Sequence, residues 1–153
     1  MASMGESKSN AVFCHTFAVP GSAVDGNGHV NNVVYVQWMQ DVAILHSDAV
    51  GGSAATEAAG ATWVARSHRI DYLKPAFAGQ DVTALTWVVD FRRVRSLRRY
   101  RFIRTSDNTL LARGETEWVF VDAQTGRPRT IPEAVARLFP LAPKGEEPGQ
   151  EAR

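Results

Sequence analysis

The sequence contains a single cysteine, Cys14, among 153 residues. One cysteine cannot form a disulfide within the chain or supply a multi-cysteine zinc site, and so low a content is typical of proteins in a reducing compartment. No apolar run approaches the roughly 18 residues that a membrane-spanning helix needs, and residues 1–10 lack the apolar core of a secretory signal. We therefore expect a cytoplasmic protein without a membrane span.

The charges also lack a dominant sign, because 17 Lys and Arg residues nearly balance 16 Asp and Glu residues and leave a net charge of +1. Such a balance provides no general attraction to nucleic acids or anionic membranes. A hydrophobic fraction of 44% in 153 residues suits one folded domain. Both ends are too polar to bury a core, so we expect one domain over residues 11–140 between disordered tails at 1–10 and 141–153.

The hydrophobic pattern predicts one long helix among several strands. Apolar residues in the segment 33–50 fall on nearly every helical face, which favours a buried central helix that starts after Asn31 or Asn32 and stops at Gly51. A loop rich in Gly, Asn and Asp precedes it, and a Gly- and Ala-rich connector follows it. Strands are predicted at 11–19, 62–72, 82–93, 97–105 and 110–121, and a short helix at 132–139. The short links between the later strands imply antiparallel hairpins, so the fold class is α+β, with the sheet curled around the central helix.

Chemistry-bearing residues gather in the loop before that helix, where Asp25 and His29 are followed by Asn31 and Asn32. The first free N–H groups of the helix point into this loop and present donors and a positive dipole end to a developing oxyanion. A carboxylate beside such donors is the minimum for acyl-transfer chemistry. Taken alone, Asp25 also suits an ordinary turn, and Asn31 and Asn32 also suit helix caps.

These residues resemble the hotdog-fold acyl-CoA thioesterases of the 4-hydroxybenzoyl-CoA thioesterase type. The resemblance rests on Asp25-x-x-Gly28-His29-Val30-Asn31-Asn32-x-x-Tyr35-x-x-Trp38, on the segment 66–75, and on the turn at 121–128. It implies a curved antiparallel sheet wrapped around one long helix. It also implies that subunits pair edge to edge as a homodimer or a dimer of dimers, with each active site built from two chains.

The resemblance further implies hydrolysis of an acyl-CoA or acyl-carrier-protein thioester, with coenzyme A present only as part of the substrate. The catalytic aspartate falls on Asp25, and the backbone amide that polarises the carbonyl falls near Asn32. Asp25 acts as nucleophile or as general base, and the sequence leaves both open. His29 orients Asp25, protonates the leaving thiolate, or packs against the loop. Substrate contacts are assigned to Gly28, Asn31, Tyr35, Trp38 and His68, although Tyr35 and Trp38 also suit core or dimer contacts.

A second feature is a basic hairpin, whose seven arginines are Arg92, Arg93, Arg95, Arg98, Arg99, Arg101 and Arg104. Guanidinium groups bind phosphates well, and the resemblance places CoA phosphates near basic residues on these strands. We therefore predict that Arg93, Arg95 and Arg98 contact the CoA phosphates. The alternative is a solvated strand face whose arginines pair with Glu115 and Glu117 across the sheet. Nucleic-acid binding is disfavoured by the low net charge.

Two other functions stay open at this stage. A hotdog dehydratase or hydratase would need a histidine and a second acid above a β-hydroxyacyl chain, and a non-catalytic acyl-CoA-binding module would keep the groove without a nucleophile. The other histidines, His15, His46 and His68, lack the spacing of metal ligands, so we expect no metal. No Gly-x-Ser-x-Gly elbow or phosphate-binding P-loop occurs in the sequence.

Overall fold

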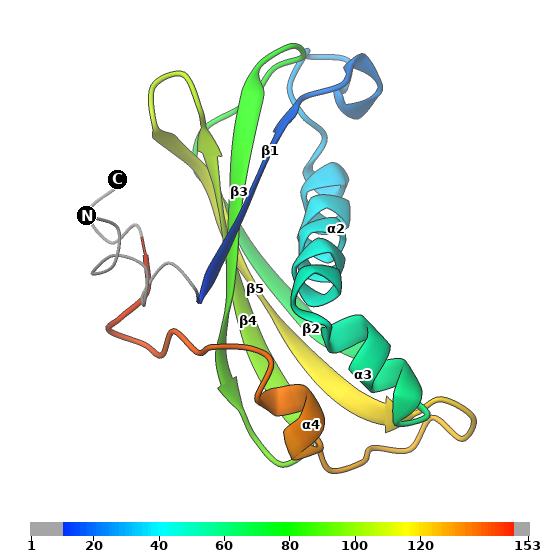
Figure 1. The fold of residues 1–153 in the computed structure, drawn as a ribbon. Helices are drawn as coiled ribbons and strands as arrows, with labels where there is room; N and C mark the ends of the chain where they lie inside the picture. The colour runs from blue at the N-terminus through cyan, green and yellow to red at the C-terminus, as the bar shows by residue number, and fades with distance from the viewer. Residues whose placement is uncertain (1–10, 149–153) are drawn as a thin grey trace.

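The computed structural model describes residues 11–148 (Figure 1). In chain order its elements are β1 (Val12–Ala18), the short 3-10 turn η1 (Gly21–Ala23), α2 (Asn32–Val50), α3 (Gly52–Ala58), β2 (Ala61–Tyr72), β3 (Asp81–Phe91), β4 (Arg95–Arg104), β5 (Thr109–Asp122) and α4 (Glu133–Ala136). The predicted succession of a strand, a long helix, four strands and a short helix is confirmed. The sequence analysis missed α3, which occupies the expected Gly- and Ala-rich connector.

The five strands form one antiparallel sheet in the order β1-β3-β4-β5-β2. This sheet curves around α2, which lies along its concave face, while α3 and α4 lie beside the far end of the same face (Figure 1). The strand order leaves β1 and β2 at the two edges. The α+β hotdog architecture expected from the sequence is therefore confirmed.

Helix α2 is held by local caps at both ends and by close packing at its middle. The side chain of Asn31 accepts a hydrogen bond from the Val33 N–H, and Gly51 ends the helix in the left-handed conformation with φ of 86°. Met39 is fully buried against the sheet at Gly114, where an added Cβ would lie 3.1 Å from the methionine sulfur. A side chain at 114 would therefore force Met39 or the neighbouring strand to shift by a few tenths of an ångström.

The expectation that α2 is buried all round is wrong for one face. Val33 is 72% exposed, Ile44 is 55% exposed and Leu45 is 38% exposed. The sheet is a single curved layer and covers only the side of α2 that carries Tyr35, Met39 and His46. The helix therefore presents apolar side chains to the outside of the isolated subunit.

Helix α3 forms because the left-handed Gly51 turns the chain and the following alanines favour helix. Its Thr56 is buried, and the hydroxyl accepts a hydrogen bond of 3.2 Å from the Trp63 indole N–H. This contact ties α3 to the start of β2. The short helix closes one end of the space between α2 and the sheet.

Residues 141–148, which the sequence analysis assigned to a disordered tail, lie on the convex face of the sheet (Figure 1). Leu141 pairs with Val88, the Ala142 N–H donates to the Val88 carbonyl at 2.9 Å, and Ala142 is buried. The Glu147 carboxylate contacts Arg99 at 2.7 Å. The polar composition of this segment did not predict these contacts, because only two apolar residues and one charged residue make them. The other parts of the expected tails, residues 1–10 and 149–153, lie outside the described residues.

Candidate active site

The loop that carries Asp25 is a tight, hydrogen-bonded turn attached to the start of α2. Val24 and Val30 pair across its base, and the Asp25 N–H donates to the His29 carbonyl at 2.7 Å. Gly28 has φ of 83°, a conformation that side-chain-bearing residues rarely adopt, which explains a glycine at this position. The Val30 N–H donates to the Ala76 carbonyl at 2.9 Å, so the turn is also fixed to the loop before β3.

The Asp25 carboxylate is oriented by main-chain amides. Its Oδ1 accepts hydrogen bonds from the N–H groups of Asn27 at 2.9 Å and of His29 at 3.3 Å. Its Oδ2 accepts no hydrogen bond from the chain between residues 11 and 148, and the side chain is exposed. One oxygen therefore holds the carboxylate in place while the other is available for chemistry.

The first turn of α2, which follows this loop in the chain, leaves one main-chain N–H unused. The Val33 N–H donates to Asn31 Oδ1 at 3.0 Å and the Val34 N–H donates to the Asn31 carbonyl at 2.9 Å. The Asn32 N–H has no acceptor within the described chain. Tyr72 at the end of β2 donates its hydroxyl to the Asn32 carbonyl at 2.8 Å and so anchors this turn to the sheet. The main-chain N–H of Asn32 is thus a fixed donor at the positive end of the helix dipole.

His29 contacts Asp25 only through the main chain. Its imidazole packs edge-on against Phe77, with ring centroids 5.1 Å apart and an interplanar angle of 86°. No hydrogen bond joins the imidazole to the Asp25 carboxylate in the part of the chain that the structure describes. The interpretation that agrees with this geometry is packing against the loop, and the backbone amides supply the orientation of Asp25.

Tyr35 and Trp38 lie in the core between α2 and the sheet. Tyr35 is buried and packs edge-to-face against Trp38, Tyr72 and Phe102, with ring centroids 5.0, 5.6 and 5.4 Å away. Burial raises the pKa of the Tyr35 hydroxyl to about 12. These contacts agree with the core alternative left open by the sequence for both residues.

A cavity of about 480 Å³ lies between the second half of α2, helix α3 and the sheet. Its apolar walls include Ala43, Ile44, Trp63 and Trp118. Its polar lining includes Gln40 and Arg98. Gln40 follows Asn32 by eight residues, which corresponds to about 12 Å along a helix. Within one subunit the Asp25 turn and this cavity are therefore separate, at opposite halves of α2.

His68 on β2 lies beside the cavity wall. Its Nδ1 is 2.8 Å from the Thr116 hydroxyl, and its Nε2 is 3.5 Å from the side-chain nitrogen of Gln40, which lines the cavity. Burial lowers the pKa of the His68 imidazole. The structure thus connects His68 to the cavity through Gln40 and does not place it at the Asp25 turn.

The sequence analysis missed a buried polar pair that joins α2 to the sheet. The Arg98 guanidinium on β4 donates through Nη1 to His46 Nδ1 at 2.9 Å and to the Thr86 hydroxyl at 3.1 Å. Burial lowers the pKa of His46 to about 3, with a further contribution from the positive charge of Arg98. The imidazole is neutral and accepts a hydrogen bond from the arginine. Strand alternation could have predicted the burial of Arg98. Residues two and four positions apart on a strand lie on the same face, so Arg98 faces the core with Tyr100 and Phe102.

The structure does not bring Arg93, Arg95 and Arg98 together. Arg93 is exposed in the turn after β3, and Arg95 lies 3.5 Å from Glu117. Arg98 instead points inward, beneath α2, where it is only 5% exposed. The predicted grouping around CoA phosphates therefore divides between the two faces of the sheet.

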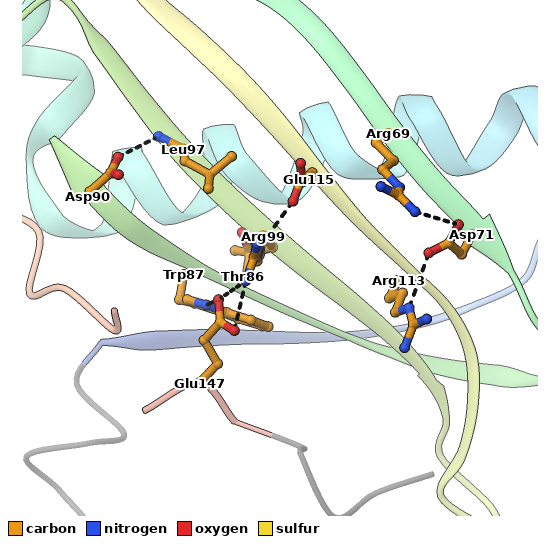
Figure 2. A network of polar contacts seen from close by, with 10 residues as sticks. All are labelled: Arg69, Asp71, Thr86, Trp87, Asp90, Leu97, Arg99, Arg113, Glu115 and Glu147. Atoms are coloured by element: carbon orange, nitrogen blue, oxygen red, sulfur yellow. Dashed lines mark hydrogen bonds and ion pairs between the residues drawn. The ribbon is translucent and has the colours of Figure 1, made fainter. Parts of the chain in front are cut away.

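Figure 2 shows the ion pairs on the convex face of the sheet. Arg99 lies between Glu115 at 3.2 Å and Glu147 at 2.7 Å, while the Trp87 indole N–H also donates to Glu147 at 3.3 Å. Arg113 contacts Asp71 at 3.2 Å. These contacts agree with the alternative of a strand face with paired charges.

Two kinds of feature are absent from residues 11–148. No group of three or more His, Cys, Asp or Glu side chains in this range is arranged to hold a metal ion. None of the helices described is both long and apolar enough to cross a membrane.

Residues 19–139 of the sequence match the Thioesterase-like superfamily. The chain belongs to this superfamily. The match covers the Asp25 turn, α2, α3 and all strands except β1. None of the curated proteins matches the sequence closely enough to count as a relative.

Solved structures show the same fold at low sequence identity. A 1,4-dihydroxy-2-naphthoyl-CoA thioesterase from Synechocystis is 16% identical with a TM-score of 0.75, over 84% of this chain and 95% of that one. A hypothetical protein from Staphylococcus aureus in complex with CoA is 22% identical with a TM-score of 0.76, over 83% and 80% of the two chains. An acyl-ACP thioesterase from Bacteroides thetaiotaomicron is 19% identical with a TM-score of 0.79, and the alignment covers 88% of this chain but 55% of that one.

Proposed function

We propose that this protein hydrolyses an acyl-CoA or acyl-carrier-protein thioester to a free acid and a thiol. The observation that carries the proposal is that one short segment holds both an oriented carboxylate, at Asp25, and a free helix N–H, at Asn32. Membership of the Thioesterase-like superfamily supports the reaction class. The finer resemblance to the 4-hydroxybenzoyl-CoA thioesterase type is part of the same proposal and rests on the spacing of residues 25–38.

Each group has a defined task in the proposed reaction. The Asn32 N–H donates to the thioester oxygen and stabilises the negative charge that develops there. The free Oδ2 of Asp25 attacks the carbonyl carbon, the thiolate leaves, and water then hydrolyses the mixed anhydride and restores the carboxylate. In the alternative route Asp25 removes a proton from water, and hydroxide attacks the same carbon directly. Both routes consume one water, release acid and thiol, and need no cofactor beyond the CoA of the substrate.

We further propose that the active site is completed by a second copy of the chain, paired along β2. The cavity borders the start of β2 through Thr62 and Trp63, whereas the end of β2 is bonded to the start of α2 through Tyr72 and Asn32. When an antiparallel edge strand pairs with itself across a twofold axis, the start of one copy lies against the end of the other. The cavity of one subunit then meets the α2 N-terminus of its partner.

This assembly predicts a particle mass of two or four times the chain mass of 16.8 kDa in solution. Light scattering after size-exclusion chromatography measures that mass directly, and dilution should lower activity and mass together. A monomer that hydrolyses thioesters at full rate would contradict the two-chain site.

The reaction itself is tested by thiol release from a panel of short, long and aromatic acyl-CoAs. We expect turnover of at least one class above the non-enzymatic rate. Because Cys14 is a free, exposed thiol, it would react with a thiol reagent, and a Cys14→Ser variant serves as the control. Tight binding of acyl-CoAs without thiol release would favour a non-catalytic binding module, with its CoA phosphates near Arg93 and Arg95. Addition of water to an enoyl-CoA would favour a hydratase.

A further inference from the structure

Arg98 is a buried cation without a carboxylate partner in the described chain. It is 5% exposed, and its hydrogen-bond acceptors are the neutral His46 imidazole and the Thr86 hydroxyl. Its guanidinium carbon lies 5.9 Å from the centre of the Phe139 ring. Other strand arginines of this sheet, such as Arg95 and Arg99, have glutamate partners. A buried charge that is not neutralised is costly, so proteins normally pair it.

Arg98 lines the cavity and has hydrogen-bond donors that no described side chain uses. Both hydrogen bonds of its guanidinium use Nη1, which leaves the N–H groups of Nη2 and Nε without acceptors among residues 11–148. Arg98 lines the cavity of about 480 Å³, together with the hydroxyls of Ser47 and Ser96. A planar guanidinium edge with two free donors is suited to bind a carboxylate through two parallel hydrogen bonds.

The remaining walls of the cavity suit a hydrocarbon chain. Ala43 and Ile44 of α2 face Trp63 and Phe91 of the sheet, and Trp118 completes this apolar section. An apolar section of wall beside a fixed polar group is typical of pockets that select a ligand by its end group. Glu57 also lines the cavity but is exposed to solvent on α3, and it forms no ion pair with Arg98.

We propose that this cavity binds an acyl group whose far end is a carboxylate, and that Arg98 recognises that carboxylate. The substrate class is then the CoA or carrier-protein thioesters of dicarboxylic acids. This inference rests on the proposed thioesterase function and adds the identity of the acyl end. His46 is a positioning residue, because its neutral Nδ1 holds one side of the guanidinium and directs the other toward the cavity.

The unmodified protein is tested first with three acyl-CoAs of equal shape. Adipyl-CoA ends in a carboxylate, adipamoyl-CoA ends in an uncharged amide, and 6-methylheptanoyl-CoA ends in an isopropyl group. A charge-assisted contact predicts that kcat/KM for the adipyl ester exceeds that for the other two by about 10- to 100-fold. The suberyl series, two methylenes longer, repeats the comparison. Equal or higher values for the isopropyl esters at both lengths would overturn the assignment of Arg98.

The Arg98→Met variant should lose this preference while it still hydrolyses 6-methylheptanoyl-CoA. The matched control is Arg113→Met, which removes an exposed arginine from the convex face and should keep the preference. Arg98→Lys retains the charge without the planar fork, so we expect an intermediate preference and use this variant if Arg98→Met does not fold. A preference that persists in either Arg98 variant at the wild-type level would overturn the proposal.

Binding of the product anion separates this inference from the proposed reaction. Trp63 and Trp118 line the cavity, so adipate should change the tryptophan fluorescence of wild type, and the Arg98→Met variant should need about 10-fold higher adipate concentration for the same change. Adipate binding that depends on Arg98 in a protein that releases no thiol would refute the proposed reaction and retain the site. Thiol release without any preference or adipate binding would refute the site and retain the reaction.

Discussion

The Asp25→Asn substitution is expected to lower kcat for thiol release by about 100-fold or more. The amide removes the negative charge that either attacks the thioester or accepts a proton from water. It keeps an oxygen at the position of Oδ1, which accepts the Asn27 and His29 N–H groups in the wild-type turn. The turn should therefore hold its shape, and the loss should appear in kcat more than in KM.

The control for this experiment is Asp41→Asn, which removes a carboxylate from the exposed face of α2, where Asp41 accepts only from the Gln37 side chain at 2.9 Å. We expect its activity to stay near that of wild type. Thermal unfolding of both variants checks that the fold is retained. An Asp25→Asn protein that is folded and turns over at more than a tenth of the wild-type rate would exclude Asp25 as the reacting carboxylate.

Acidification is expected to lower the free energy of unfolding, because His46 becomes protonated when the chain unfolds. The pKa of His46 is lowered from 6.5 to about 3 by burial and by Arg98, so between these values the unfolded chain binds a proton that the folded chain does not. The contribution of His46 to stability is therefore fully present above pH 6.5 and is lost as the pH falls toward 3. A single group of this kind changes the free energy of unfolding by about 1.4 kcal/mol per pH unit across that window.

The His46→Gln variant isolates this effect, because glutamine retains a side-chain oxygen to accept from Arg98 but does not titrate. Carboxylates contribute to acid unfolding in both proteins, so the difference between the two curves reports His46. Denaturant unfolding from pH 7 to pH 4 should show wild type losing stability more steeply than the variant. Parallel curves would show that the imidazole is not held neutral by its site.

The wild-type protein is also expected to retain its Arg98 geometry only while His46 is neutral. A protonated imidazole would place a second positive charge 2.9 Å from the Arg98 nitrogen and would have no lone pair for it. The pair is thus stable because both burial and the neighbouring cation favour the same protonation state. Arg98 therefore keeps its hydrogen-bond acceptor only as long as the His46 imidazole stays uncharged.

The fold and the Asp25 turn were largely readable from the sequence because they depend on residues that are close in the chain. Asn31 caps α2 two residues later at Val33, and Gly51 ends the same helix, so local patterns place both boundaries correctly. The carboxylate of Asp25 is held by amides within four residues of it. Runs of β-branched and aromatic residues between turn signals likewise identified β2 to β5. Helix α3 was missed because an alanine-rich stretch beside glycines resembles a flexible link.

The tertiary structure alone decided where the arginines of the basic hairpin point and what each one contacts. Arg98 meets His46 across 52 positions of sequence, and Arg99 meets Glu147 across 48. Both contacts join segments that are distant in the sequence, so they depend on how α2 and residues 141–148 pack against the sheet. Side chains of neighbouring residues on a strand face opposite sides, so a cluster that looks continuous in sequence divides between the cavity and the convex face. The sequence by itself therefore determined the fold and the carboxylate turn, while the cavity and its buried cation arose only from long-range packing.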